Sequence, residues 1–158
     1  MAGLVKAPFI PSPKEVVREA IEFSRVSPSD VFYDLGAGDG RVVFEAAKRG
    51  AYCVAVEIDP YLVEVIREKA SVLGLNDRVR VVEASFYDVY LGDATVVYIY
   101  LYRSVIEKLV DKFERELRIG ARIVSLDFSI PSWIPVRVRR LLDRRGIVRT
   151  LYLYIIGF

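Results

Sequence analysis

A glycine-rich segment that begins with a carboxylate is the part of the sequence best suited to chemistry. Residues 31–40 read Val-Phe-Tyr-Asp-Leu-Gly-Ala-Gly-Asp-Gly, which predicts a buried strand, a turn, and a helix that starts near Arg41. Three glycines lack the Cβ atoms that would keep a ligand away from the backbone. Asp34 lies two residues before the first glycine. These features predict a small-molecule site at the end of this strand.

The spacing of the glycines distinguishes two classes of ligand. A dinucleotide fingerprint has the form G-x-G-x-x-G, in which the third glycine packs the helix on the strand. This chain has G-x-G-x-G, and Arg41 stands where that third glycine would fall. A carboxylate at the mouth of the site would also repel a pyrophosphate. Asp34 instead suits a ligand that carries an ammonium group and a sulfonium.

Residues 34–40 resemble motif I of the class I, seven-strand methyltransferases, whose cofactor is S-adenosyl-L-methionine. A second match is Glu57, which ends the next expected strand 17 residues after Gly40. The resemblance implies that Glu57 binds both ribose hydroxyls, as acidic residues do in dinucleotide folds. The alternative for Glu57 is a solvated charge at a strand end. The resemblance also implies S-adenosyl-L-homocysteine as product and no metal.

The same resemblance assigns further residues to the cofactor. Ile58 is expected to cover one face of the adenine. The family usually has an acidic residue after the third strand for the adenine amine, where this chain has Ser85. The serine hydroxyl or the Phe86 backbone could serve instead. The predicted cofactor set is Asp34, Leu35, Gly36, Ala37, Gly38, Gly40, Glu57, Ile58, Ser85, Phe86 and Tyr98.

Aromatic residues near the ends of two later strands are candidates for the acceptor site. Tyr98, Tyr100 and Tyr102 alternate, so they are expected to share one face of a strand. Trp133 follows the next strand. Because aromatic walls suit a cationic or methylated ammonium, Tyr100, Tyr102 and Trp133 are predicted to position the acceptor. Packing in the core is the alternative for these residues, and the favoured one for Tyr98.

A longer pattern resembles the small archaeal protein-lysine methyltransferases and the enzymes that methylate a lysine of the ATP synthase c-subunit. It consists of residues 11–13, 34–40 and 93–97, Tyr100 with Leu101, and residues 125–128 followed by Trp133. The resemblance implies N-methylation of lysines in protein substrates, often with a loose sequence preference. The chain has no histidine. That absence fits a reaction that needs little help from a general base.

Other functions stay open from the sequence alone. An RNA or DNA methyltransferase could use a cluster of arginines at Arg137, Arg139, Arg140, Arg144, Arg145 and Arg149. The cluster predicts a surface for an acidic protein or a nucleic acid, and its alternative is a solvated hairpin face. Enzymes that methylate base amines usually carry an Asn/Asp-Pro-Pro-Tyr/Phe motif, whereas residues 100–103 read Tyr-Leu-Tyr-Arg. A small-molecule methyltransferase and a binding module without catalysis are the remaining alternatives.

Composition limits the class of protein. A chain of 158 residues is expected to form a single domain. Its net charge of +2 imposes no strong field, and its single cysteine, Cys53, allows neither an internal disulfide nor a metal cluster. No signal peptide and no membrane span are recognised, so a cytoplasmic protein is expected. Glutamine is absent and asparagine occurs once, which predicts a thermophilic, archaeal source.

Strands that alternate with helices predict a Rossmann-like, doubly wound α/β fold with a mostly parallel seven-strand sheet. Residues 1–28 are expected to form an N-terminal helical segment, 31–128 the cofactor-binding core, and 136–156 an antiparallel β-hairpin. Ser12, Pro13 and Glu15 predict the start of the first helix, with Ser12 as N-cap and Glu15 completing a capping box. Asp59 and Pro60 predict the start of a later helix.

Overall fold

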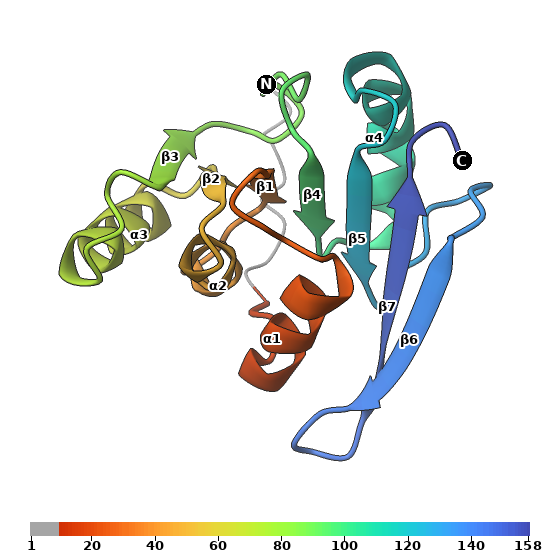
Figure 1. The fold of residues 1–158 in the computed structure, drawn as a ribbon, viewed down its shortest axis with the longest axis horizontal. Coiled ribbons are helices and arrows are strands. Elements are labelled where there is room, and N and C mark those ends of the chain that lie inside the picture. Colours follow the sequence, from red (N-terminus) through yellow and green to blue (C-terminus); the bar gives the residue numbers. More distant parts are fainter. Residues whose placement is uncertain (1–9) are drawn as a thin grey trace, which may run out of the picture.

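Seven strands form one sheet in the order β3-β2-β1-β4-β5-β7-β6 in the computed structural model, which describes residues 10–158 (Figure 1). The strands are β1 (Val31–Leu35), β2 (Tyr52–Glu57), β3 (Val79–Glu83), β4 (Val96–Ile99), β5 (Arg122–Leu126), β6 (Arg137–Leu142) and β7 (Val148–Ile155). The helices are α1 (Lys14–Phe23), α2 (Arg41–Lys48), α3 (Pro60–Val72) and α4 (Arg103–Glu116).

The first five strands are parallel, and β7 runs antiparallel to both β5 and β6. Only ten residues separate β5 from β6, too few for a crossover helix. The chain therefore closes the sheet with a hairpin, in which β7 lies between β5 and β6. The predicted fold class, including the antiparallel hairpin, is confirmed.

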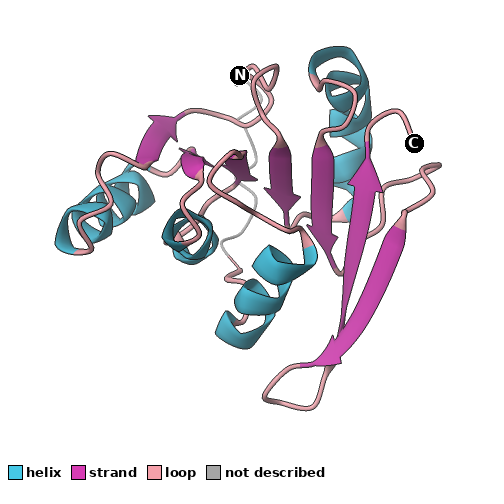
Figure 2. Cartoon of the chain, viewed as in Figure 1, coloured by secondary structure: helices cyan, strands magenta, loops and turns pink. Residues whose placement is uncertain are grey.

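Helices cover both faces of the sheet (Figure 2). Apolar side chains of α1, α2 and α3 share one buried cluster, and those of α4 belong to a second cluster on the opposite face. Every residue of β4 is buried because this central strand is covered on both sides. In the described part of the chain, no helix has both the length and the apolar character needed to cross a bilayer.

The two predicted helix caps have different outcomes. Asp59 accepts a hydrogen bond from the Tyr61 amide (2.9 Å), so the predicted cap of α3 is confirmed. The predicted capping box of α1 is wrong. Pro13 is the N-cap, and the Ser12 hydroxyl hydrogen-bonds the Tyr98 hydroxyl instead (2.8 Å). Glu15 accepts the Arg144 amide of the hairpin turn (2.8 Å), so tertiary partners have displaced both local contacts.

Candidate active site

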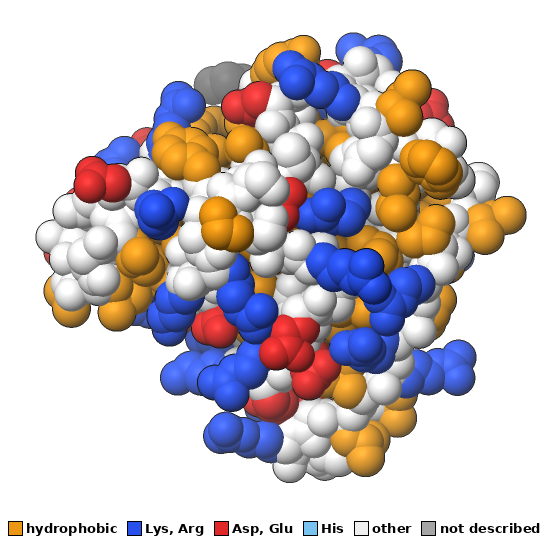
Figure 3. All heavy atoms as spheres, viewed as in Figure 1, with side chains coloured by type: hydrophobic (Ala, Val, Ile, Leu, Met, Phe, Trp, Pro, Cys, Tyr) orange, Lys and Arg blue, Asp and Glu red, His pale blue; other side chains and the backbone are white. Residues whose placement is uncertain are grey.

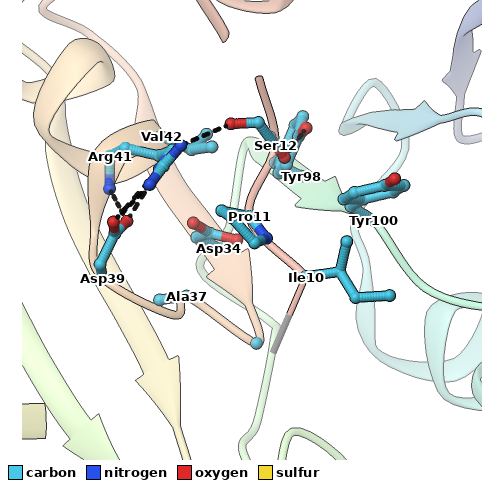
Figure 4. A pocket seen from close by; sticks show the side chains of 11 residues that line it. Ile10, Pro11, Ser12, Asp34, Ala37, Asp39, Arg41, Val42, Tyr98 and Tyr100 are labelled. Carbon is cyan, nitrogen blue, oxygen red and sulfur yellow. Dashed lines mark hydrogen bonds and ion pairs between the residues drawn. The ribbon is translucent and has the colours of Figure 1, made fainter. Parts of the chain in front are cut away.

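A pocket lies at the carboxyl ends of β1 and β4, where the strand order reverses. Open α/β sheets bind ligands at this point because the connections leave the sheet in opposite directions there. Asp34 of β1 is in register with Tyr98 of β4. The lining residues shown in Figure 4 are Ile10, Pro11, Ser12, Asp34, Gly36, Ala37, Asp39, Arg41, Val42, Tyr98 and Tyr100.

Asp34 is the most unusual group in the pocket. The residue is only 3% exposed, and no hydrogen bond to its carboxylate is found within residues 10–158. Burial, together with the smaller effect of the negative charges of Glu57 and Asp39, raises the pKa of Asp34 to about 8. A buried carboxylate without a partner is costly to ionise. A positively charged ligand group would supply the missing partner.

The glycine turn connects Asp34 to α2 through left-handed backbone. Gly36, Gly38 and Gly40 have φ values of +82°, +60° and +86°. The amides of Gly36 and Ala37 both donate to the Val56 carbonyl (2.9 Å each), which ties the turn to β2. Since L side chains disfavour this region, the turn depends on its glycines.

Glu57 fixes the other side of the turn. One carboxylate oxygen accepts the Gly38 amide (2.8 Å) and the other accepts the Asp59 amide at the start of α3 (2.9 Å). Glu57 is 8% exposed and is therefore not a solvated strand-end charge. Each carboxylate oxygen can accept more than one hydrogen bond, so these contacts leave capacity for ligand hydroxyls.

The segment before α1 forms another wall of the pocket. The Arg41 guanidinium donates to the Ser12 carbonyl (3.0 Å) and pairs with Asp39 (2.7 Å), and Figure 4 shows these bonds beside Asp34. Burial alone would raise the pKa of Asp39, but hydrogen bonds from Arg41 hold it below its ordinary value. Burial raises the pKa of Tyr98, whose hydroxyl is paired with Ser12.

The candidate acceptor residues do not all reach the pocket. Tyr100 lines it, as does Tyr98, which was predicted to contact the cofactor. Tyr102 is 47% exposed and packs edge-on against Phe128, with ring centroids 5.7 Å apart. Trp133 packs against Phe113 and Tyr154 (6.4 and 6.0 Å between centroids) on the face covered by α4.

Comparisons with known proteins identify the family of the chain. The family model of the ANTKMT methyltransferase domain matches residues 34–137, which include the glycine turn, Glu57 and both pocket tyrosines. The chain belongs to this methyltransferase family. The predicted recognition of a seven-strand methyltransferase is thereby confirmed.

Individual relatives agree with the family match. A protein-lysine N-methyltransferase of Saccharolobus islandicus is 39% identical, over 99% of this chain and 98% of that protein. A human lysine N-methyltransferase of the ATP synthase c-subunit is 30% identical over 83% of this chain, which spans 56% of that protein. The crystal structure of an RNA methyltransferase from Salinibacter ruber, in complex with S-adenosyl-L-homocysteine, has a TM-score of 0.86 and 39% identity. That comparison covers 93% of this chain and 94% of the other.

The residues predicted to hold adenine lie outside the pocket lining of this methyltransferase. Ile58 is half-buried after β2, and the Ser85 hydroxyl accepts the Tyr87 amide (3.3 Å). The Phe86 ring lies beside the turn, 3.8 Å from the position that a Cβ on Gly36 would occupy. Leu35 packs in the core on the α4 face.

Sequence reasoning missed four polar residues around the pocket of the methyltransferase. Ser12, Asp39 and Arg41 line it, and Arg149 bonds the hydroxyl of Tyr100 (2.8 Å). Arg41 had a local signal, because it replaces the third glycine of the dinucleotide fingerprint and stands two residues from Asp39. Ser12 resembled a helix cap, and Arg149 resembled one more member of a basic hairpin.

Proposed function

We propose that this methyltransferase transfers the methyl group of S-adenosylmethionine to lysine side chains of proteins. The observation that carries the proposal is the buried carboxylate of Asp34, which has no hydrogen-bond partner within residues 10–158 and lies at the glycine turn in a chain of this family. The protein-lysine N-methyltransferase of Saccharolobus islandicus, similar over nearly the whole chain, supports lysine as the acceptor.

The residues that line the pocket and those beside it fit this cofactor. Asp34 would hold its positively charged end, since the described part of the chain offers its buried carboxylate no other partner. Glu57 would accept the ribose hydroxyls beside the turn. Gly36 is exposed, so a ligand could approach its backbone on the side where the Phe86 ring lies. Ile58, Ser85 and Phe86 would surround the adenine there. When bound, the cofactor supplies an electrophilic methyl group on a positively charged sulfur.

An acceptor lysine needs to be neutral to react, although its reference pKa is about 10.4. A nearby positive charge and an apolar channel both lower the pKa of an amine. The enzyme then has mainly to hold the two reactants at reacting distance, which contributes up to about 7–11 kcal/mol in favourable systems. Tyr98 and Tyr100 on the pocket wall are the aromatic groups available for this task. Tyr102 and Trp133 do not line the pocket, so they would contact only those parts of the substrate protein that stay outside it.

The test is to incubate the protein with labelled S-adenosylmethionine and a native cell extract and to identify the labelled products by mass spectrometry. The proposal predicts label on lysine Nζ atoms of proteins, and much less label with the Asp34→Asn variant at a cofactor concentration near the wild-type Kd. Label confined to RNA would reject lysine as the acceptor.

An RNA methyltransferase is the second candidate function. The structure named as an RNA methyltransferase from Salinibacter ruber is 39% identical to this chain, and Arg140 and Arg145 are exposed on the hairpin. The end of β4 argues against methylation of base amines, because Tyr100 and Tyr102 stand where such enzymes usually carry their Pro-Pro motif. The same labelling experiment, with nucleic acid and protein fractions counted separately, distinguishes the two functions.

The hairpin of β6 and β7, which carries the arginine cluster, turns at the same edge of the sheet as the pocket. Protein substrates would contact it there. Basic side chains gather over β6 and β7 in Figure 3, but several have partners on α1. Arg137 and Arg139 lie over the Phe23 ring (5.1 and 5.2 Å), and Arg139 pairs with Glu19 (3.2 Å). Within residues 10–158, no salt bridge involves Arg140 or Arg145, which are exposed and could contact an acidic protein surface.

The double variant Arg140→Glu/Arg145→Glu is expected to raise KM for an acidic protein substrate at least tenfold, because like charges would then meet. Cofactor affinity should stay unchanged, and the effect should shrink at high salt as charges are screened. The control variant, Arg115→Glu/Arg118→Glu, reverses the charge of two exposed arginines near the end of α4. An equal KM increase in the control would show that the effect is one of net charge and not of the hairpin.

A cytoplasmic location and a thermophilic archaeal source also belong to this proposal. The composition supports the source, as does the similar protein from Saccharolobus islandicus.

A further inference from the structure

A largely buried cluster of charges lies behind the pocket, between β5, β7 and the hairpin turn. Arg149 of β7 is 9% exposed. Its guanidinium donates two hydrogen bonds to one oxygen of Asp127 (2.6 and 2.9 Å) and pairs with Asp143 at 3.4 Å. Asp143 is itself buried and accepts the amides of Arg145 and Ile147. The cluster therefore holds one positive and two negative groups, of which Arg149 and Asp143 are buried and Asp127 is partly exposed.

The cluster reaches the pocket through Tyr100. Arg149 Nη2 donates to the Tyr100 hydroxyl (2.8 Å), and the guanidinium carbon lies 5.6 Å from the centroid of the tyrosine ring. Tyr100 in turn lines the pocket opposite the glycine turn (Figure 4). The tyrosine ring thus has the pocket on one side and a fixed cation on the other.

The backbone around Asp127 holds the cluster in one arrangement. Asp127 follows β5 directly and has a φ of +65°, which is uncommon for a residue with a side chain. Its amide donates to the Thr150 carbonyl (2.7 Å), and its carboxylate accepts the Thr150 amide (3.1 Å). Such strained backbone persists where surrounding contacts determine it, and it is concentrated at functional sites.

We propose that Arg149 is a positioning residue that orients the Tyr100 hydroxyl for the acceptor lysine; this inference rests on the proposed function. Arginine only donates hydrogen bonds, so the bond from Arg149 occupies one lone pair of the hydroxyl oxygen and turns the hydroxyl proton away. The second lone pair stays free to accept an N–H of the lysine amine. That bond would fix the rotation of the nitrogen at the pocket wall.

The two carboxylates explain how an arginine can stand behind an amine site. An unpaired guanidinium next to the pocket would repel a lysine that arrives as an ammonium ion. Asp127 and Asp143 neutralise Arg149 and leave the cluster with a net charge of −1. The pair also raises the pKa of Arg149 above its ordinary value, chiefly through the hydrogen bonds to Asp127.

The experiment is a double-mutant cycle with Tyr100→Phe and Arg149→Met. We expect each single variant to lower kcat for lysine methylation at least tenfold while the cofactor Kd stays within about twofold. The double variant should be no slower than the slower single variant, because Arg149 acts through Tyr100. Arg149→Lys is a further variant, because it keeps the positive charge and removes the planar fork that serves two partners. Compared with Arg149→Met, Arg149→Lys should restore the melting temperature closer to the wild-type value than it restores kcat.

Arg122→Met is the matched control. Arg122 pairs with the buried Asp30 (2.9 Å) at the amino end of β5, whereas the pocket lies at the carboxyl ends of the parallel strands. The control should lower the melting temperature and leave kcat unchanged at temperatures where the protein stays folded. Independent losses of kcat in the double variant, or Arg149 variants that change only the melting temperature, would overturn the inference. A wild-type enzyme that labels no lysine would instead reject the proposed function.

Discussion

Asp34→Asn is expected to weaken S-adenosylmethionine binding by about 30-fold or more and, at the same time, to stabilise the folded protein. The first effect follows because removing one partner of a buried charge pair costs about 2–5 kcal/mol. Isothermal titration calorimetry at pH 8 measures it. The second effect follows because the carboxylate is buried and has no hydrogen-bond partner among residues 10–158. An amide of the same shape carries no charge that folding has to remove from water.

The gain in stability should depend on pH with a definite sign. The pKa of Asp34 is about 8 in the folded protein, against an ordinary value of 3.8 in the unfolded chain. Between these values the folded state binds more protons than the unfolded state, so wild-type stability falls as pH rises. The stability difference between Asp34→Asn and wild type should therefore grow by about 1.4 kcal/mol per pH unit from about pH 4 to pH 8 and then level off.

Denaturant unfolding of both proteins at pH 5, 6, 7, 8 and 9 checks this trend. A proton-release measurement gives an independent test. At pH 7 the free wild-type protein should carry a mostly protonated Asp34, so binding a cationic ligand should release close to one proton from this site. Calorimetry in buffers of different ionisation enthalpy reads out that proton, and Asp34→Asn should lack it. A stability difference that does not vary with pH would show that Asp34 is ionised in the free pocket.

Gly40→Ala is expected to destabilise the protein by about 2–4 kcal/mol, from left-handed strain and overpacking together. Gly40 has a φ of +86°, and a Cβ there would lie 2.7 Å from the Phe44 ring and 3.2 Å from the Ile66 side chain. Both side chains are buried in the same core cluster, so neither can move away cheaply. The measurement is the free energy of unfolding from denaturant titration.

Gly74→Ala separates the two contributions. Gly74 also has left-handed backbone, with a φ of +68°, but a Cβ there would meet no atom of residues 10–158 within 4 Å. Its alanine variant should lose only the conformational term, about 1 kcal/mol. Equal losses at Gly40 and Gly74 would mean that the third glycine of the motif is required only for its backbone angle and not for packing.

Local patterns predicted most of the fold. The strand before the glycine turn, the Asp59 cap and the C-terminal hairpin depend on neighbours in the sequence, and each was found close to its expected position. Asp34 was predicted for the same reason, since its place is fixed by the strand and turn that contain it. The pocket itself lies where the reversal of strand order requires.

Contacts between residues far apart in the sequence could not be predicted from local patterns. Ser12 is 86 positions from Tyr98, and Arg149 is 49 positions from Tyr100, so nothing near either residue revealed its partner. The alternation of tyrosines failed as a guide at Tyr102 because β4 already ends at Ile99 and the chain turns into α4. Trp133 follows β5, whose carboxyl end lies at the same edge of the sheet as the pocket. The Trp133 ring nevertheless packs against Phe113 of α4.

The most direct measurement is a crystal structure of the protein in complex with S-adenosylhomocysteine, the product that the proposed reaction leaves in the pocket. We expect the amino-acid end of the ligand to lie against Asp34, its ribose against Glu57 and its sulfur to face the side of the pocket that carries Tyr100. A ligand bound elsewhere on the protein, or bound here with neither carboxylate in contact, would contradict this expectation.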